Sequence, residues 1–286
     1  MPSSFSLRAC LKSAFTVARK NHWLWIFGFF IGSSLLILDF DKINFVNVGQ
    51  MSLSGIFTLL KQQLGVGGFS TMMIIGVVLV LFFVFLSIYA RSSLIFGLSQ
   101  LFAGNLIPFG RIAKSGFTFL PRIILLELLL ILPALVFGAL TIVGINRDSL
   151  LLFLLFAIPL VVYLIFVFLF KHYIYGEAII AKKSAKASIV GGFLIFKNNY
   201  QKLLLAKLVE LCLWISLGIG SVFILALFFL PFMLLGVFFY FSIGEIVFNF
   251  MIIFSVFLLA FAFFLIKGFS LTFIQAYLTK VYLSAK

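Results

Sequence analysis

A series of continuous apolar runs constrains the fold of this chain more than any other feature. A helix needs about 20 apolar residues to cross a bilayer, and several runs reach that length. With 64% hydrophobic residues, 10% charged residues and a mean hydropathy of +1.31, a soluble domain could not hide its apolar surface. Barrel strands would alternate in shorter segments. We therefore expect an all-helical integral membrane protein.

Three basic, aromatic segments precede apolar runs, and we call them elbows 1, 2 and 3. They cover residues 12–20, 114–122 and, in a looser form, 190–198, and they are centred on Phe15, Phe117 and Phe193. Around elbow 1, apolar side chains fall on one helical face and basic side chains on the other. Such a helix lies in the membrane interface, or it packs on the rest of the protein as a cytoplasmic extension. The sequence leaves both placements open.

Two spans after each elbow give six membrane-spanning helices. They are expected at about residues 22–38, 72–89, 122–145, 150–170, 203–230 and 246–265. The loop between the first two spans should contain a glycine-rich break at 65–68. Residues 146–149 are a short connection that predicts a tight antiparallel pair of the third and fourth spans. The run at 203–242 could hold one long helix or two short ones. With six spans, residues 231–242 are expected to form an interfacial or re-entrant piece, and the last lysines an amphipathic tail.

The distribution of basic residues predicts the orientation of the spans. With six spans, 18 of the 21 basic residues share one side, and only Lys42, Lys61 and Arg147 lie opposite. The positive-inside rule makes the basic side cytoplasmic. Seven spans would place the C-terminal lysines outside, which is less favourable. The sequence therefore predicts cytoplasmic N- and C-termini in a multi-pass protein of the plasma membrane.

The elbows divide one polytopic membrane domain, residues 1–286, into three comparable units. The units cover residues 5–104, 105–183 and 184–286, and each contains one elbow and two spans. Two spans return the chain to the same side, so such repeats would be parallel, related by an axis along the membrane normal. The alternative is convergent use of one interfacial segment in three places.

The arrangement resembles a group of bacterial six-span membrane proteins, mostly of unknown function. It is similar to the membrane domain of membrane-anchored glycerophosphoryl diester phosphodiesterases. The resemblance depends on the segments around Phe15, Phe117 and Phe193 and on Tyr175-Gly176-Glu177-Ala178 after the fourth span. It implies the fold, a bacterial inner membrane and a lipid-facing role. It implies no catalytic residue, because the chain has no phosphodiesterase domain.

Charge and cysteine content exclude several other classes of protein. The net charge is +14, but the basic residues flank apolar runs, where they meet anionic headgroups rather than nucleic acid. Cys10 and Cys212 lie in unrelated contexts and predict neither a disulfide framework nor a metal site. His22 and His172 flank spans without a partner at metal-ligand spacing, and we interpret them as interfacial side chains. No catalytic, metal or cofactor motif is present, so an enzyme acting on lipid is the least favoured class.

Three ionisable residues within the spans form the candidate intramembrane site. Glu127 lies near the start of the third span, and Glu210 lies in the fifth, three residues after Lys207. Lys207 and Glu210 are spaced to pair along one helix face. An ionisable group inside a span is a functional candidate. The alternative, which we favour, is a structural role in which the carboxylates bond elbow backbone or the side chains of Arg122, Lys202 and Lys207.

The basic residues around the elbows are the candidate contacts for anionic lipid headgroups. They are Arg8, Lys12, Arg19, Lys20, Arg111, Lys114, Arg122, Lys182, Lys183, Lys186, Lys197 and Lys202. We expect a non-enzymatic membrane protein that interacts with lipid or serves as a membrane scaffold or accessory protein. The alternative is a transporter or permease subunit that uses Glu127 and Glu210. Membrane lipids are the expected partners, together with a further membrane protein or an ATPase.

Overall fold

The computed structural model describes residues 6–31, 53–147, 149–243 and 245–286, and their regular structure is helical throughout. The helices are α1 (Leu7–Lys20), α2 (Leu24–Ile31), α4 (Leu53–Phe102), α5 (Phe109–Asn146), α6 (Leu150–Ile179), α7 (Ala185–Asn198), α8 (Tyr200–Ile243) and α9 (Glu245–Ala285). The prediction of an all-helical fold is confirmed.

Among the described residues, five helical segments are long and apolar enough to cross a membrane. They are Ile74–Phe102, Phe109–Asn146, Leu150–Ile179, Tyr200–Leu227 and Ile253–Ala285. Such a set is typical of a multi-pass membrane protein. The predicted first span, 22–38, begins with α2, but its residues from 32 onward lie outside the described part of the chain. A count of six spans therefore stays a prediction.

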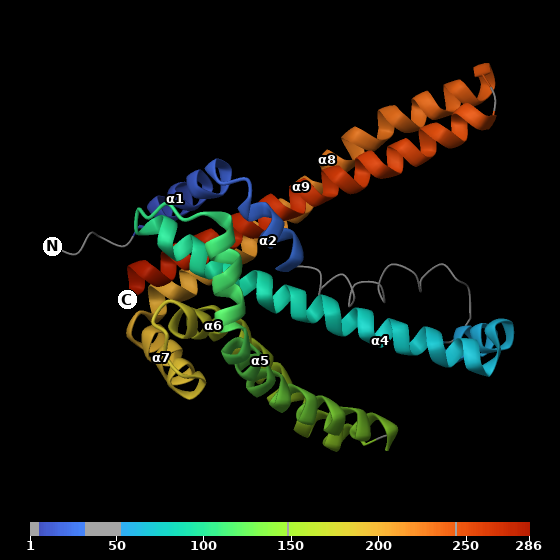
Figure 1. Cartoon of the computed structure of the whole chain (residues 1–286). Coiled ribbons are helices and arrows are strands. Elements are labelled where there is room, and N and C mark those ends of the chain that lie inside the picture. Colours follow the sequence, from blue (N-terminus) through green and yellow to red (C-terminus); the bar gives the residue numbers. More distant parts are fainter. Residues whose placement is uncertain (1–5, 32–52, 148, 244) are drawn as a thin grey trace.

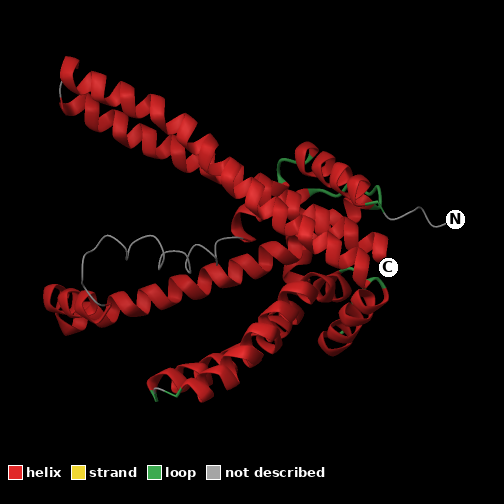
Figure 2. Cartoon of the chain, turned by 180° about the vertical axis from the view of Figure 1, so that it is seen from behind, coloured by secondary structure: helices red, strands yellow, loops and turns green. Residues whose placement is uncertain are grey.

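The long helices diverge as three arms from a common base (Figure 1). One arm is α4, the second is the pair α5–α6, and the third is the pair α8–α9. The base consists of α1, α2, α7 and the adjoining ends of the long helices, and the C-terminus lies there beside α1. The same division is visible from behind (Figure 2).

Buried residues concentrate in the base, whereas the arms expose apolar side chains. Tyr173, Tyr277 and Tyr282 are fully buried in the base. By contrast, no residue in the most apolar stretch of α6 is buried. Apolar surface all round a helix suits contact with lipid rather than with water. The arms are therefore the part of the fold that fits a bilayer.

The last two turns of α6 form the centre of the base. Every residue from 172 to 179 is buried, including the sequence Tyr175-Gly176-Glu177-Ala178. Close packing explains the glycine: a Cβ on Gly176 would lie 2.7 Å from the ring of Tyr282 in α9. A Cβ on Gly192 of α7 would lie 2.8 Å from the backbone nitrogen of Ile174. Only residues without a side chain allow this approach.

Each elbow packs on a long helix of a different arm. Elbow 1 lies in α1 and contacts α9, elbow 2 lies in α5 and contacts α4, and elbow 3 lies in α7 and contacts α6. The ring contacts are Phe15 with Phe269 and Phe273, Phe117 with Tyr89, and Phe193 with Phe170. Each elbow thus joins its own unit to the last helix of another unit.

Several predicted boundaries were wrong because the helices continue through residues interpreted as breaks. Residues 65–68 lie inside α4, and residues 231–242 continue α8 through Pro231 rather than forming a separate piece. Elbow 2 is not a separate helix, since α5 continues through Pro121. One glycine costs a helix about 1 kcal/mol relative to alanine. In lipid the backbone has no other hydrogen-bond partner, so a helix persists through such residues.

The helices α1 and α9 both pack into the base. Helix α1 buries Cys10, Ala14 and Ala18 and packs on α9, as in the second placement considered for elbow 1. The predicted amphipathic C-terminal tail is wrong: residues 271–282 belong to α9, and most are buried in the base. The tail was predicted to be amphipathic because of its lysines. Its Tyr and Leu residues instead determine its placement in the base.

Candidate functional site

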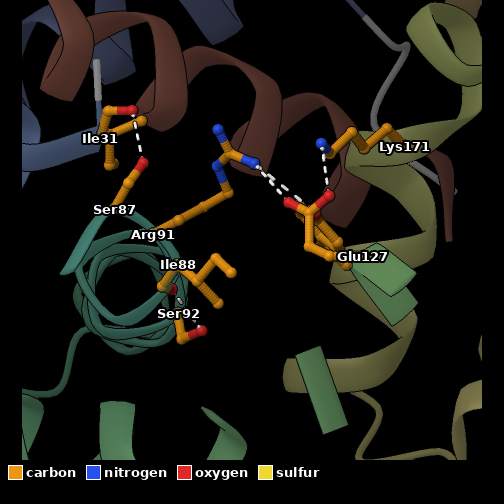
Figure 3. Close-up of polar contacts among 8 residues, drawn as sticks. Ile31, Ser87, Ile88, Arg91, Ser92, Glu127 and Lys171 are labelled. Carbon is orange, nitrogen blue, oxygen red and sulfur yellow. Dashed lines mark hydrogen bonds and ion pairs between the residues drawn. The ribbon is translucent and has the colours of Figure 1, made fainter. Parts of the chain in front are cut away.

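Glu127 lies at the junction of three helices, where two cations and a hydroxyl group contact its carboxylate. In α5, Glu127 is buried against α4 and α6. Arg91 Nη1 of α4 lies 3.1 Å from Oε1, and Lys171 Nζ of α6 lies 2.8 Å from Oε2. The hydroxyl of Tyr175 also donates a hydrogen bond to Oε1. Figure 3 shows Arg91 and Lys171 reaching the carboxylate from two sides.

These contacts explain how a carboxylate is tolerated in an apolar setting. Burying an unpaired charge is costly, and pairing offsets that cost only when the geometry is good and further hydrogen bonds are made. Glu127 meets both conditions with Arg91, Lys171 and Tyr175. The expected structural role is consistent with this geometry, but the expected partner Arg122 is wrong. Arg122 Nη1 instead donates to the carbonyl of Ala178 at 3.0 Å.

Lys207 and Glu210 form a second buried pair on α8. The Lys207 ammonium lies 2.7 Å from Oε2 of Glu210, and both side chains are almost fully buried. This contact confirms the pairing predicted from their spacing. The ammonium also lies 4.8 Å from the centre of the Phe168 ring on α6, a favourable cation–π distance. The pair therefore links α8 to α6.

Both groups of charges border one pocket of about 400 Å³ where the arms meet. Its walls come from α4, α6, α8 and α9. Its charged lining residues are Arg91, Lys171, Lys207 and Glu210, and Glu127 lies directly behind the first two. Three cations thus face two carboxylates, which leaves one positive charge in excess. Such a pocket suits an anion.

The position of His172 differs from the one predicted from the sequence. It was expected at the membrane interface, but it is buried in the base and lines the pocket. His22, by contrast, is exposed and lies 5.0 Å from the Trp25 ring. The residues His172, Lys171 and Arg91 were not predicted as site residues, because each was interpreted as marking the end of a span. The signal was available: apolar residues continue on both sides of each.

Glu177 is a third buried carboxylate, and sequence reasoning did not select it as a site residue. It accepts a hydrogen bond of 2.7 Å from the Tyr282 hydroxyl, contacts Lys183, and lies 3.5 Å from Lys286 Nζ. A Cβ on Gly191 would lie 2.6 Å from its Oε2. These contacts join α6, α7 and α9. This geometry indicates a structural role, in which Glu177 holds the three helices together.

The predicted headgroup contacts lie mostly on the surface of the base. All of them are exposed except Arg122, and Lys183 is exposed but paired with Glu177. Phe15, Phe117 and Phe193 are 44–58% exposed beside these cations. The three carboxylates described in the base are buried and paired. The described surface of the base therefore combines exposed cations with exposed rings.

Comparison of the chain with protein-family models, with curated proteins and with solved structures finds no match.

Proposed function

We propose that this protein is a multi-pass protein of the plasma membrane that binds anionic lipid headgroups through its base. The observation that carries the proposal is the distribution of charge at the base. Its cations are exposed around the elbows, whereas Glu127, Glu177 and Glu210 are buried and paired. The exposed cations of such a base attract an anionic surface, and the buried, paired carboxylates do not repel it.

The exposed aromatic rings beside the cations indicate that the partner of the base is a membrane surface rather than a soluble polyanion. Phe15, Phe117 and Phe193 each project partly from an elbow whose opposite face is packed on a long helix. Aromatic side chains at such positions insert below the headgroups while cations contact phosphates. The elbows then set the depth of the base, and the apolar arms cross the bilayer with both termini in the cytoplasm.

The transporter alternative is less well supported by the described residues. A proton or ion path needs ionisable groups that are accessible along a lined route. Glu127 is held by three partners, and Glu210 is paired with Lys207. The arms diverge and bury few residues between them (Figure 2). We infer that the two carboxylates hold helices together at the base.

Lipid retention by elbow variants tests the proposal. The triple variant Lys12→Gln, Lys114→Gln, Lys197→Gln removes one exposed cation from each elbow. Each removed charge should cost about 1 kcal/mol of attraction to an anionic surface. We expect a clear fall in anionic lipid per protein, measured by mass spectrometry after extraction in a mild detergent.

A variant with the same loss of charge elsewhere provides the control. Lys42→Gln, Lys61→Gln, Arg147→Gln removes three cations from the side predicted to face away from the cytoplasm. This control should retain anionic lipid as the unmodified protein does. Equal retention by the elbow variant and the control would contradict the proposal.

A further inference from the structure

Four residues that line the central pocket each carry a buried polar atom without a hydrogen-bond partner among the described residues. Three of these atoms are Arg91 Nε on α4, His172 Nε2 on α6 and Gln275 Oε1 on α9, and the fourth, Glu210 Oε2 on α8, is ion-paired with Lys207. His172 is 94% buried, since its exposed fraction is 6%. An unsatisfied buried polar group destabilises a fold, and folded proteins contain few of them. Four of the nine such atoms in the described part of the chain belong to residues of this one pocket, and this concentration points to a bound ligand.

The packing of the elbows explains why these three residues converge. Each follows, by two positions, an aromatic residue that contacts an elbow phenylalanine. The pairs are Tyr89 and Arg91, Phe170 and His172, and Phe273 and Gln275. Since each elbow fixes the rotation of one long helix, the residue two positions later points to a common centre. Helices from all three arms thus supply one polar side chain each.

The charge of the pocket indicates an anionic ligand. One positive charge is in excess when Glu127 and Glu210 are counted against Arg91, Lys171 and Lys207. Guanidinium and ammonium groups bind phosphate oxygens through charge-assisted hydrogen bonds. The free Arg91 Nε–H is a donor for such an oxygen, and Gln275 Oε1 can accept from a hydroxyl group.

The apolar part of the lining indicates that the ligand carries a hydrocarbon chain. Phe168 lies one turn farther along the α6 arm than Lys171, and Trp214 one turn farther along the α8 arm than Glu210. Both rings line the pocket, and Trp214 is 38% exposed. A free phosphate compound has no hydrocarbon chain to contact these two rings. A lipid would place its headgroup against the cations and its chains beside the rings.

We propose that this pocket binds the phosphate-bearing headgroup of a single anionic lipid, with its acyl chains leaving between the α6 and α8 arms. The inference deepens the proposed lipid function. It uses no elbow cation, so that either proposal can fail alone. The elbow surface acts on the leaflet as a whole, whereas the pocket selects one molecule.

Quenching of Trp214 fluorescence by brominated lipid tests the site directly. The chain has three tryptophans, so Trp23→Phe, Trp25→Phe leaves Trp214 as the reporter. In neutral micelles, brominated phosphatidylglycerol should quench Trp214 saturably, and brominated phosphatidylcholine should not. Arg91→Lys and Gln275→Leu, which keep the net charge, should each weaken the apparent affinity about tenfold through a lost hydrogen bond. The exposed controls Arg147→Lys and Gln201→Leu should leave it unchanged.

Three further results identify the ligand and keep the test independent of any one variant. Glycerol 3-phosphate should not compete with the brominated lipid at equal concentration. Full competition would show that a free phosphate compound suffices, which would overturn a lipid site. Equal quenching by both lipids, or unchanged affinity in both pocket variants, would overturn it as well. Native mass spectrometry of the unmodified protein should show one tightly retained anionic lipid, which the elbow triple variant keeps.

Discussion

At the scale of single residues, the buried carboxylates of the base act as links between helices. Glu127 of α5 joins Arg91 of α4 to Lys171 of α6 through one side chain (Figure 3). Glu177 of α6 similarly contacts α9 through Tyr282. Both replace part of the apolar packing by charge pairing, which fixes the relative rotation of the helices.

Replacing Glu127 by glutamine should destabilise the base. Glu127→Gln keeps the shape but leaves Arg91 and Lys171 close together without a compensating charge. Breaking a buried pair costs about 3–5 kcal/mol, and the partial exposure of both cations lowers our expectation to about 2 kcal/mol. Unfolding by SDS in mixed micelles, followed by circular dichroism, measures the change.

A double variant separates the loss of the pair from a general effect of the substitution. Glu127→Gln, Lys171→Gln should recover part of the loss, because one unpaired cation is removed with the carboxylate. A double variant less stable than the sum of the two single variants would contradict the assigned pairing.

The sequence predicted Glu127 and Glu210 as ionisable residues within spans, but it predicted only some of their partners. Lys207 was identified because i,i+3 spacing on one helix is a local relation. Arg91 and Lys171 lie 36 and 44 residues from Glu127 along the chain, so only the packing of α4, α5 and α6 brings them together. No local pattern carries that information.

At the scale of helices, two glycines of α7 set the distance between α6 and α7, because they have no side chain to keep the helices apart. Gly192 meets the backbone of Ile174, and Gly191 meets the Glu177 side chain. Elsewhere glycines have open surroundings: a Cβ on Gly138 of α5 would meet nothing within 4 Å. The same residue type therefore has two distinct roles in this chain.

Two alanine substitutions should distinguish these roles. Gly192→Ala forces α7 away from α6 and should destabilise the base by about 1–3 kcal/mol, as overpacking does in other cores. The control Gly138→Ala should leave stability unchanged or raise it by about 0.5 kcal/mol through helix propensity. The SDS midpoint of each variant checks the difference. Equal midpoints would show that α7 does not pack closely on α6.

Helices were predicted better than their ends. Apolar runs indicate a helix strongly, but glycine and proline end a helix only where water or a turn satisfies the freed backbone groups. Residues 65–68 and Pro231 therefore lie inside α4 and α8. By contrast, α5 ends at Asn146 and α6 begins at Leu150, as the short connection in the sequence predicts.

At the scale of the whole molecule, the elbows connect three arms into one base. Elbow 1 contacts α9, elbow 2 contacts α4 and elbow 3 contacts α6, so each elbow joins its unit to a different unit. The sequence showed the similarity of the elbows but not this exchange, which depends on how the units assemble. That the three units are repeats, related by an axis along the membrane normal, stays a prediction.

Cysteine labelling of intact cells tests the central claim that the base lies at the cytoplasmic leaflet. In a background of Cys10→Ser, Cys212→Ser, one cysteine is placed at exposed Lys12, Lys114 or Lys186 in the base, or at exposed Asn146 at the tip of an arm. A membrane-impermeant maleimide should label position 146 in intact cells and the base positions only after permeabilisation. Labelling of the base positions in intact cells, with protection of position 146, would contradict the account.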